Sequence, residues 1–244
     1  MDYLSVFAIN CRSISTEAEL APVSGLLSDL GQGSLACFPE YFLDGAERYA
    51  GIGRQEAFHG LLELAKQRSI YLSFGMVENT DSKKHITGFL VDYNGKILGS
   101  QHKINPTSFE KASGILPGND LTEIINTDFG TLAFRICFDQ WRPDLSVGPE
   151  IVLHPRGFGL NDEKYGQFYS NWLMLDRTTA ILRKAFLIGT TGDYGQNPLA
   201  DIIDFEGNIL AEKDSAGLVG ASLDLGSLRD YRAKIKPAKT VPKF

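Results

Sequence analysis

The chain has 244 residues, of which 43% are hydrophobic and 22% are charged, so it can bury the core of one large globular domain. Its formal net charge is −6, from 24 basic and 30 acidic residues, which argues against a nucleic-acid partner. Three cysteines do not make a disulfide framework, and no basic leader or long apolar stretch is present. We therefore expect a cytoplasmic protein without a membrane partner.

The first half of the chain alternates predicted strands and helices. Apolar runs predict strands at residues 4–9, 35–38, 70–75, 121–125 and 131–136. Apolar residues at helical spacing predict helices over residues 20–30 and 58–65. Asn94-Gly95 is typical of a two-residue hairpin turn, here between 89–93 and 96–99.

The second half consists mainly of predicted strands, at residues 150–154, 186–189, 200–204, 209–211 and 218–223. A long helix is expected to present Phe168, Trp172, Leu175, Thr179 and Leu182 on one face, and a short helix covers 225–231. This order favours a layered α/β fold with mixed sheets. We find no internal boundary and expect a single domain over 1–244, with 230–244 as a tail that reaches solvent or a partner subunit.

Three reactive side chains stand where predicted strands end, namely Glu40, Lys103 and Cys137. A thiol must lose its proton before it attacks an amide-type carbon, and a buried carboxylate can accept that proton. An ammonium group and the Phe138 backbone N–H can hold the oxyanion that forms. Each residue alone has an ordinary alternative: an exposed carboxylate, a solvated lysine or an inert buried thiol.

In order and spacing, these residues resemble the nitrilase superfamily of carbon–nitrogen hydrolases. The matching segments are Phe38-Pro39-Glu40, Gly95-Lys96-Ile97-Leu98 with His102-Lys103-Ile104, and Ile136-Cys137-Phe138-Asp139. The resemblance covers nearly the whole chain. It implies that Glu40 is the general base, Lys103 the oxyanion stabiliser and Cys137 the nucleophile. It also implies that Glu110 orients the lysine and the substrate, that the fold is an α/β/β/α sandwich, and that the protein forms a homodimer or a larger even assembly.

Within the superfamily, Cys137-Phe138-Asp139-Gln140-Trp141 followed by Pro143 most resembles the N-carbamoylputrescine amidase branch. Residues 155–159 resemble that branch as well. Four positions depart from the family pattern: Leu182 replaces a common glutamate, Thr191 a common asparagine, Asn10 a common glutamine and Arg142 an apolar aromatic residue of that branch. These departures put the substrate in doubt.

Five residues are candidates for substrate binding: Phe138, Trp141, Arg142, His154 and Arg156. If Arg142 and Arg156 line the pocket, they favour a substrate carboxylate over a cationic diamine. Alternatively, both point to solvent or pair with Asp144 and Glu150. His154 could pair with Cys137 as in papain-like hydrolases, although the lysine and glutamates already explain activation, and we favour a place in the pocket wall.

The sequence thus predicts an amidohydrolase with no cofactor and no metal, acting on a small amide, carbamoyl or nitrile substrate through a cysteine thioester. A nitrilase, or an ω-amidase acting on dicarboxylate monoamides, is the alternative among enzymes. A non-catalytic binding protein that keeps the fold is the alternative from another class.

Overall fold

The structure is a computed structural model that describes residues 2–44, 55–119, 123–141, 148–157, 162–192 and 199–235, with only the backbone described for 162–169. Its strands form two six-stranded sheets. The first sheet has the order β12-β1-β2-β3-β4-β5, with bounds Gly217–Asp224, Tyr3–Asn10, Leu35–Cys37, Tyr71–Thr80, Lys83–Val91 and Ile97–His102. The second has the order β11-β10-β9-β8-β7-β6, with bounds Ile209–Lys213, Ala200–Ile203, Phe186–Thr191, Ile151–Arg156, Thr131–Phe134 and Ile125–Asn126.

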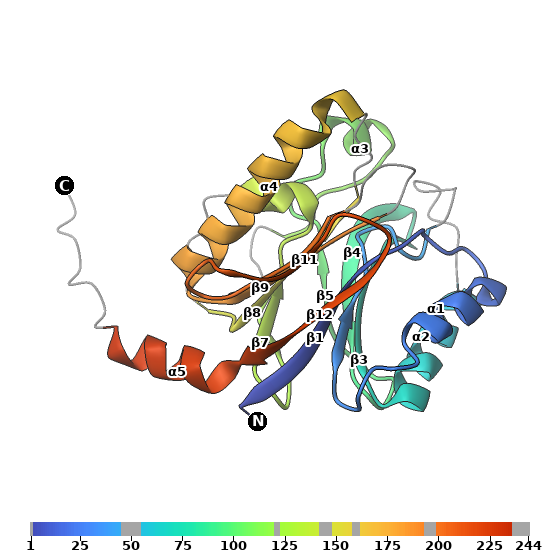
Figure 1. Ribbon diagram of the computed structural model, residues 1–244. Helices are drawn as coiled ribbons and strands as arrows, with labels where there is room; N and C mark the ends of the chain where they lie inside the picture. The colour runs from blue at the N-terminus through green and yellow to red at the C-terminus, as the bar shows by residue number, and fades with distance from the viewer. Residues whose placement is uncertain are drawn as a thin grey trace.

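The two sheets pack face to face between two layers of helices (Figure 1). Helices α1 (Leu20–Leu26) and α2 (Gln55–Arg68) cover the outer face of the first sheet, and α4 (Asp162–Arg183) covers the second. Helix α5 (Leu225–Lys234) continues from β12, and the five-residue α3 (Ser108–Ala112) follows β5. Short 3-10 helices span Glu17–Glu19 and Cys137–Trp141. The predicted α/β/β/α sandwich is the observed architecture.

Each sheet has three neighbouring parallel strands, β1-β2-β3 in the first and β7-β8-β9 in the second, and the remaining pairs are antiparallel. Parallel strands covered on both faces consist of continuous apolar runs, which is the pattern seen at Leu35–Cys37. The chain leaves β2 just before Glu40 and leaves β7 just before Cys137. Both segments therefore follow the carboxyl ends of parallel strands, where open α/β sheets place their sites.

The core between the sheets takes alternate residues of each strand. Leu35 and Cys37 belong to the cluster between the sheets, whereas Ala36 belongs to the cluster under α1 and α2. Phe134 of β7 lies directly against Gly88 of β4, where a methyl group would come within 2.8 Å of the ring. Gly88 therefore makes room for an aromatic ring and lets the sheets approach closely.

Two predicted strands are longer in the structure. The strand predicted at 150–154 continues through Pro155 to Arg156. β7 ends at Phe134, opposite Leu153, so no strand on that side requires an N–H from Pro155. The strand predicted at 70–75 extends to Thr80 and returns as β4 through Asp81 and Ser82, which have positive φ values of 51° and 62°.

The face of α4 that packs on the second sheet also differs from the prediction. Within residues 170–183 the buried side chains are Trp172, Asp176, Ala180 and Arg183, whereas Leu182 is 49% exposed; the side chain of Phe168 lies outside the described residues. Apolar periodicity missed this face because two of its members are charged. No helix in the described ranges is long and apolar enough to span a membrane.

Candidate active site

Glu40 is held rigidly beyond the end of β2. Pro39 has no N–H for the ladder, so the strand stops there. The Pro39 carbonyl accepts a hydrogen bond from the N–H of Gly75 on β3 at 3.1 Å. The backbone of Glu40 is thus fixed to the neighbouring strand, and its side chain is only 1% exposed.

Lys103 follows β5 and directs a fully buried ammonium group toward two carboxylates. Its backbone N–H donates to the carbonyl of Ile86 at 2.7 Å. Its Nζ donates to Oε1 of Glu40 at 2.7 Å and to Oε1 of Glu110 at 2.7 Å. The structure therefore brings together three residues that lie up to 70 positions apart in the sequence.

Glu110 is fixed by the first turn of α3. Its Oε2 accepts the backbone N–H of Thr107 at 2.6 Å, and its own N–H donates to the Thr107 hydroxyl at 3.3 Å, which makes a capping box. Its Oε1 accepts the phenol of Tyr41 at 2.5 Å in addition to the Lys103 ammonium. Both oxygens are therefore committed to fixed donors, and the carboxylate orients the lysine.

Cys137 opens the 3-10 helix Cys137–Trp141, and β7 ends earlier than predicted, at Phe134. Its φ of +47° lies in the left-handed region, which few residues other than glycine adopt. The side chain is 7% exposed. The Glu40 carboxylate and the Gly157 backbone N–H both lie close enough to the sulfur to influence its charge. The turn thus directs the sulfur at the carboxylate and lysine that the other sheet supplies.

The charges of the site set the proton positions. Burial raises the pKa of Glu40 to about 7, against the lowering effect of Lys103 and with a further increase from Glu110. Burial and the Glu40 charge raise the pKa of Cys137, so the resting group is a thiol. Burial alone would lower the pKa of Lys103, but Glu40, Cys137 and Glu110 outweigh it and raise that pKa. Burial raises the pKa of Glu110, but the charge of Lys103 and hydrogen bonds from Lys103, Tyr41 and Thr107 together bring it below its usual value, so that group is a carboxylate.

Asp139 joins the two halves of the site. Its Oδ2 accepts the backbone N–H of Ile104 at 3.1 Å, and its Oδ1 accepts that of Asn105 at 2.6 Å. These two N–H groups follow Lys103 directly, whereas Asp139 lies two residues after Cys137. The carboxylate therefore fixes the segment that carries the lysine to the segment that carries the thiol.

Two aromatic side chains of the 3-10 helix remain exposed. Phe138 is 44% exposed and Trp141 is 48% exposed, with their ring centroids 6.4 Å apart. Trp141 also contacts Trp172 of α4 edge-on, at 5.9 Å between centroids. Both rings lie close in sequence to Cys137, and a role in substrate binding stays a prediction for them.

The other substrate-binding predictions meet different outcomes. Arg142 lies outside the described residues, as does Asp144. Arg156 neither reaches a pocket mouth nor contacts Glu150: it is 0% exposed, and its guanidinium pairs with Asp176 and Asp201. The prediction for Arg156 is therefore corrected, because a group enclosed by two carboxylates has no free donor face for a substrate.

His154 is also fully buried, and it lies behind the nucleophile. Its Nε2 is 3.3 Å from the carbonyl oxygen of Cys137, and its Nδ1 is 2.7 Å from Oδ1 of Asp176. Both ring nitrogens therefore face protein groups. This placement argues against a papain-like pairing with the sulfur and against a direct polar contact with substrate.

Sequence reasoning missed the importance of Gly157. A methyl group built on its Cα would overlap both the Tyr41 ring and Oε2 of Glu40. Its N–H also contacts the Cys137 sulfur. Only a residue without a side chain fits between the general-base candidate and the thiol, and an isolated glycine after a strand carries no such signal in one sequence.

Sequence reasoning also missed Asp176 and Asp201. Asp176 lies four residues after Trp172 on α4, so a charged residue occupies the buried face of a helix. Burial raises the pKa of each carboxyl to about 6, although Arg156 lowers both. A carboxylate at a helical core position was the available signal, since such residues are buried only with a partner.

Known proteins resemble this chain in both sequence and fold. Residues 29–233 match the family profile described as carbon-nitrogen hydrolase, a stretch that contains Glu40, Lys103, Glu110 and Cys137. The chain belongs to the carbon–nitrogen hydrolase family. The predicted relationship to the nitrilase superfamily is therefore confirmed at the level of the family.

Three known proteins show the extent of the similarity. A hydrolase of Schizosaccharomyces pombe is 24% identical over 209 residues, which cover 77% of this chain and 63% of that protein, so this chain spans less than two thirds of its length. The omega-amidase NIT2 of Homo sapiens is 23% identical over 219 residues, covering 81% of this chain and 74% of that protein. A carbon-nitrogen hydrolase from Helicobacter pylori G27 superposes with a TM-score of 0.81 at 19% identity, covering 95% of this chain and 92% of that chain. The last comparison confirms the fold.

Proposed function

We propose that this protein is an amidohydrolase that cleaves a non-peptide carbon–nitrogen bond through a cysteine thioester. The observation that carries the proposal is the buried contact of Lys103 with Glu40 and Glu110 beside the Cys137 thiol. Four ionisable groups share one enclosed space and have shifted pKa values, which is typical of catalytic sites. No step of the proposed reaction requires a cofactor.

In the first half-reaction, Glu40 removes the proton of Cys137 as the sulfur attacks the amide carbon. A carboxylate whose pKa is near 7 suits this task at neutral pH, because it can both accept and return a proton. The oxyanion forms beside the Lys103 ammonium and the Phe138 backbone N–H. The carbon–nitrogen bond then breaks, the nitrogen takes the proton from Glu40, and the amine or ammonia leaves a thioester on Cys137.

In the second half-reaction, water replaces the departed nitrogen. Glu40, again ionised, takes a proton from the water while the water oxygen attacks the thioester carbon. The same two donors stabilise the second oxyanion. Collapse breaks the carbon–sulfur bond, the sulfur recovers a proton from Glu40, and the acid product leaves. Glu110 takes no proton and keeps Lys103 in place.

Turnover of small amides by the purified protein tests the proposal. We expect release of ammonia or amine by the wild type, and loss of at least about 1,000-fold in kcat for Cys137→Ala. Cys11→Ala is the matched control, because that thiol lies outside the site. Intact-protein mass spectrometry should also show faster alkylation at Cys137 than at the buried Cys37. Wild-type turnover in Cys137→Ala would refute the mechanism, and an inert Cys137 would favour the non-catalytic binding protein.

For the substrate, we propose a small amide or carbamoyl amide. The segment Cys137-Phe138-Asp139-Gln140-Trp141 favours the N-carbamoylputrescine amidase branch. Similarity to an omega-amidase favours monoamides of dicarboxylic acids instead. The arginine argument for an acidic substrate now depends on Arg142 alone, since Arg156 is enclosed. Comparing kcat/KM for N-carbamoylputrescine, a dicarboxylate monoamide and a nitrile separates these substrates.

We also propose a homodimer or a larger even assembly in a reducing compartment. The segments predicted to cross the two-fold axis, 141–145 and 234–244, lie almost wholly outside the described residues. Sedimentation of the protein at micromolar concentration checks the assembly, and a pure monomer would contradict it.

A further inference from the structure

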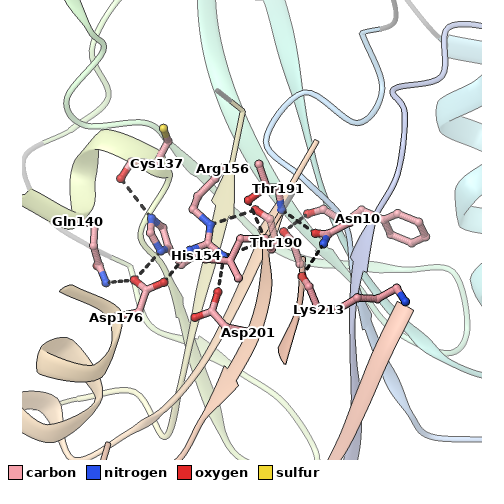
Figure 2. A network of polar contacts seen from close by, with 12 residues as sticks. Asn10, Cys137, Gln140, His154, Arg156, Asp176, Thr190, Thr191, Asp201 and Lys213 are labelled. Atoms are coloured by element: carbon pink, nitrogen blue, oxygen red, sulfur yellow. Dashed lines mark hydrogen bonds and ion pairs between the residues drawn. The ribbon is translucent and has the colours of Figure 1, made fainter. Parts of the chain in front are cut away.

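A buried polar network lies next to Cys137, and the proposed reaction makes no use of it (Figure 2). Arg156 is its centre: Nη1 donates to Asp176 Oδ2 at 2.8 Å, and Nη2 donates to Asp201 and to the carbonyl of Leu199. His154 and Arg156 come from β8, Asp176 from α4 and Asp201 from β10. All four side chains are 0% exposed, so water does not replace any of these contacts.

His154 connects this network to the nucleophile. Its Nε2 is aligned with the Cys137 carbonyl oxygen at 3.3 Å (Figure 2). Its Nδ1 lies 2.7 Å from Asp176 Oδ1, but within the described part of the chain it has no aligned hydrogen-bond partner. The ring is also packed against Trp172 of α4, at 5.2 Å between centroids. The aligned contact of the ring is therefore the one to the backbone of Cys137.

The proton count supports the same contact. Burial and then the positive charge of Arg156 lower the pKa of His154 well below its usual value, so the ring is neutral. A neutral imidazole has one N–H, and a carbonyl oxygen can only accept. Because the contact of Nδ1 with Asp176 is close but not aligned, we place the proton on Nε2, where it donates to the carbonyl of Cys137.

The network contacts both ends of the 3-10 helix that carries the thiol. At its first residue, the Cys137 carbonyl accepts from His154. Toward its end, Gln140 Nε2 donates to Asp176 Oδ1 at 2.6 Å. Because Cys137 has a left-handed backbone, its conformation needs support from the surrounding structure. The carbonyl contact and the Gln140 contact together oppose rotation of this short helix.

We propose that His154 is a positioning residue for the nucleophile, whose Nε2–H holds the Cys137 carbonyl so that the sulfur points at Glu40 and Lys103. The inference deepens the proposed function and depends on it. His154 does not exchange protons with the sulfur or touch the substrate. Its role is to fix the strained turn, with the Trp172 ring packed against the imidazole.

Two amide substitutions separate this role from simple packing. In His154→Gln the amide nitrogen reaches the place of Nε2 and can still donate to the Cys137 carbonyl. In His154→Asn the shorter side chain reaches only the place of Nδ1, and the carbonyl loses its donor. We expect kcat of His154→Asn to be about 10–100-fold lower than that of His154→Gln, with KM within about threefold, because small misplacements of a reacting group slow chemistry more than binding.

The alternative outcomes are distinct. Equal kcat in the two variants, or losses of kcat that follow their unfolding free energies, would overturn the role of His154. Wild-type protein that turns over no amide would instead contradict the proposed function. In that case the rate of iodoacetamide alkylation at Cys137 compares the same two variants without turnover, and we expect the slower reaction in His154→Asn.

A measurement on the wild type avoids the risk that a variant fails to fold. The chain has four histidines, so the ¹⁵N NMR signals of the His154 ring are assigned by comparison with three variants, each lacking one of the other histidines. We expect His154 to carry its proton on Nε2 across neutral pH. A bare Nε2 with the proton on Nδ1 would leave the Cys137 carbonyl without a donor and would refute the proposal.

Discussion

At the scale of single residues, the site depends on buried charged groups, none of which would stay charged there without its partners. Lys103 and Glu110 keep their charges because each faces the other at 2.7 Å. Glu40 also contacts Lys103, but burial and the nearby Glu110 raise its pKa to about 7. One carboxylate thus stays ionised as a support while the other is poised to exchange protons.

The raised pKa of Glu40 predicts the pH dependence of turnover. The base must be ionised, so kcat/KM should rise with pH through about 7 and fall about tenfold per unit below it. The raised pKa of Cys137 adds no further fall of kcat/KM at acid pH, because the resting thiol is protonated throughout that range. A pH profile of kcat/KM from 5 to 9 measures this. The absence of a limb near pH 7 would contradict the raised pKa of Glu40.

Gly157 provides a second test at this scale. Gly157→Ala should lower kcat/KM by about 100-fold or more, because the methyl group displaces the Glu40 carboxylate and the Tyr41 ring. Gly25→Ala on α1 is the matched control, since a methyl group there meets nothing within 4 Å and should leave kcat/KM unchanged. Steady-state kinetics on both variants decide the matter, and an active Gly157→Ala enzyme would contradict the packing argument.

At the scale of elements, the site is carried by very short pieces that could not hold their shape alone. Helix α3 has five residues, and so does the 3-10 helix Cys137–Trp141. Helices this short gain little from their own hydrogen bonds. Side-chain bonds to backbone groups replace that support: Glu110 closes the capping box of α3, and Asp139 fixes the segment after Lys103.

Replacing Asp139 tests this support. In Asp139→Asn one oxygen becomes an amide N–H₂ that opposes a backbone N–H, so one buried donor loses its acceptor. We expect a loss of about 1–3 kcal/mol in the free energy of unfolding and a fall in kcat of about tenfold or more. Asp204→Asn is the control, because Asp204 accepts two backbone N–H groups in an exposed hairpin turn. Denaturant unfolding and steady-state kinetics measure both effects. Equal losses of stability and kcat in the two variants would contradict the proposed support by Asp139.

At the scale of the whole molecule, each sheet supplies half of the site. Glu40 and Lys103 follow strands of the first sheet, whereas Cys137 and Gly157 follow strands of the second. Their separation therefore depends on how the sheets pack. Phe134, the last residue of β7, fills the interface against Gly88 of β4.

Phe134→Ala should destabilise the protein by about 3–5 kcal/mol, because it leaves a cavity between the sheets. It should also lower kcat, since Cys137 lies three residues further along the chain. Phe109→Ala is the control for stability: its ring is 66% exposed, and we expect a change within about 0.5 kcal/mol. Denaturant unfolding of both variants provides the measurement. A loss below 1 kcal/mol for Phe134→Ala would mean that the sheets repack around the cavity.

By itself, the sequence determined the layered α/β architecture, most strand positions and the family. Alternation of apolar runs, turns and short motifs is local, and Glu40, Lys103, Glu110 and Cys137 each stand in such a motif. The tertiary structure decided which charged residues are buried. The sequence predicted that Arg156 lines the pocket and that Leu182 lies on the apolar face of α4. The fold instead encloses Arg156, Asp176 and Asp201, because a charge can leave water only where partners from other elements surround it, and no local pattern shows such partners.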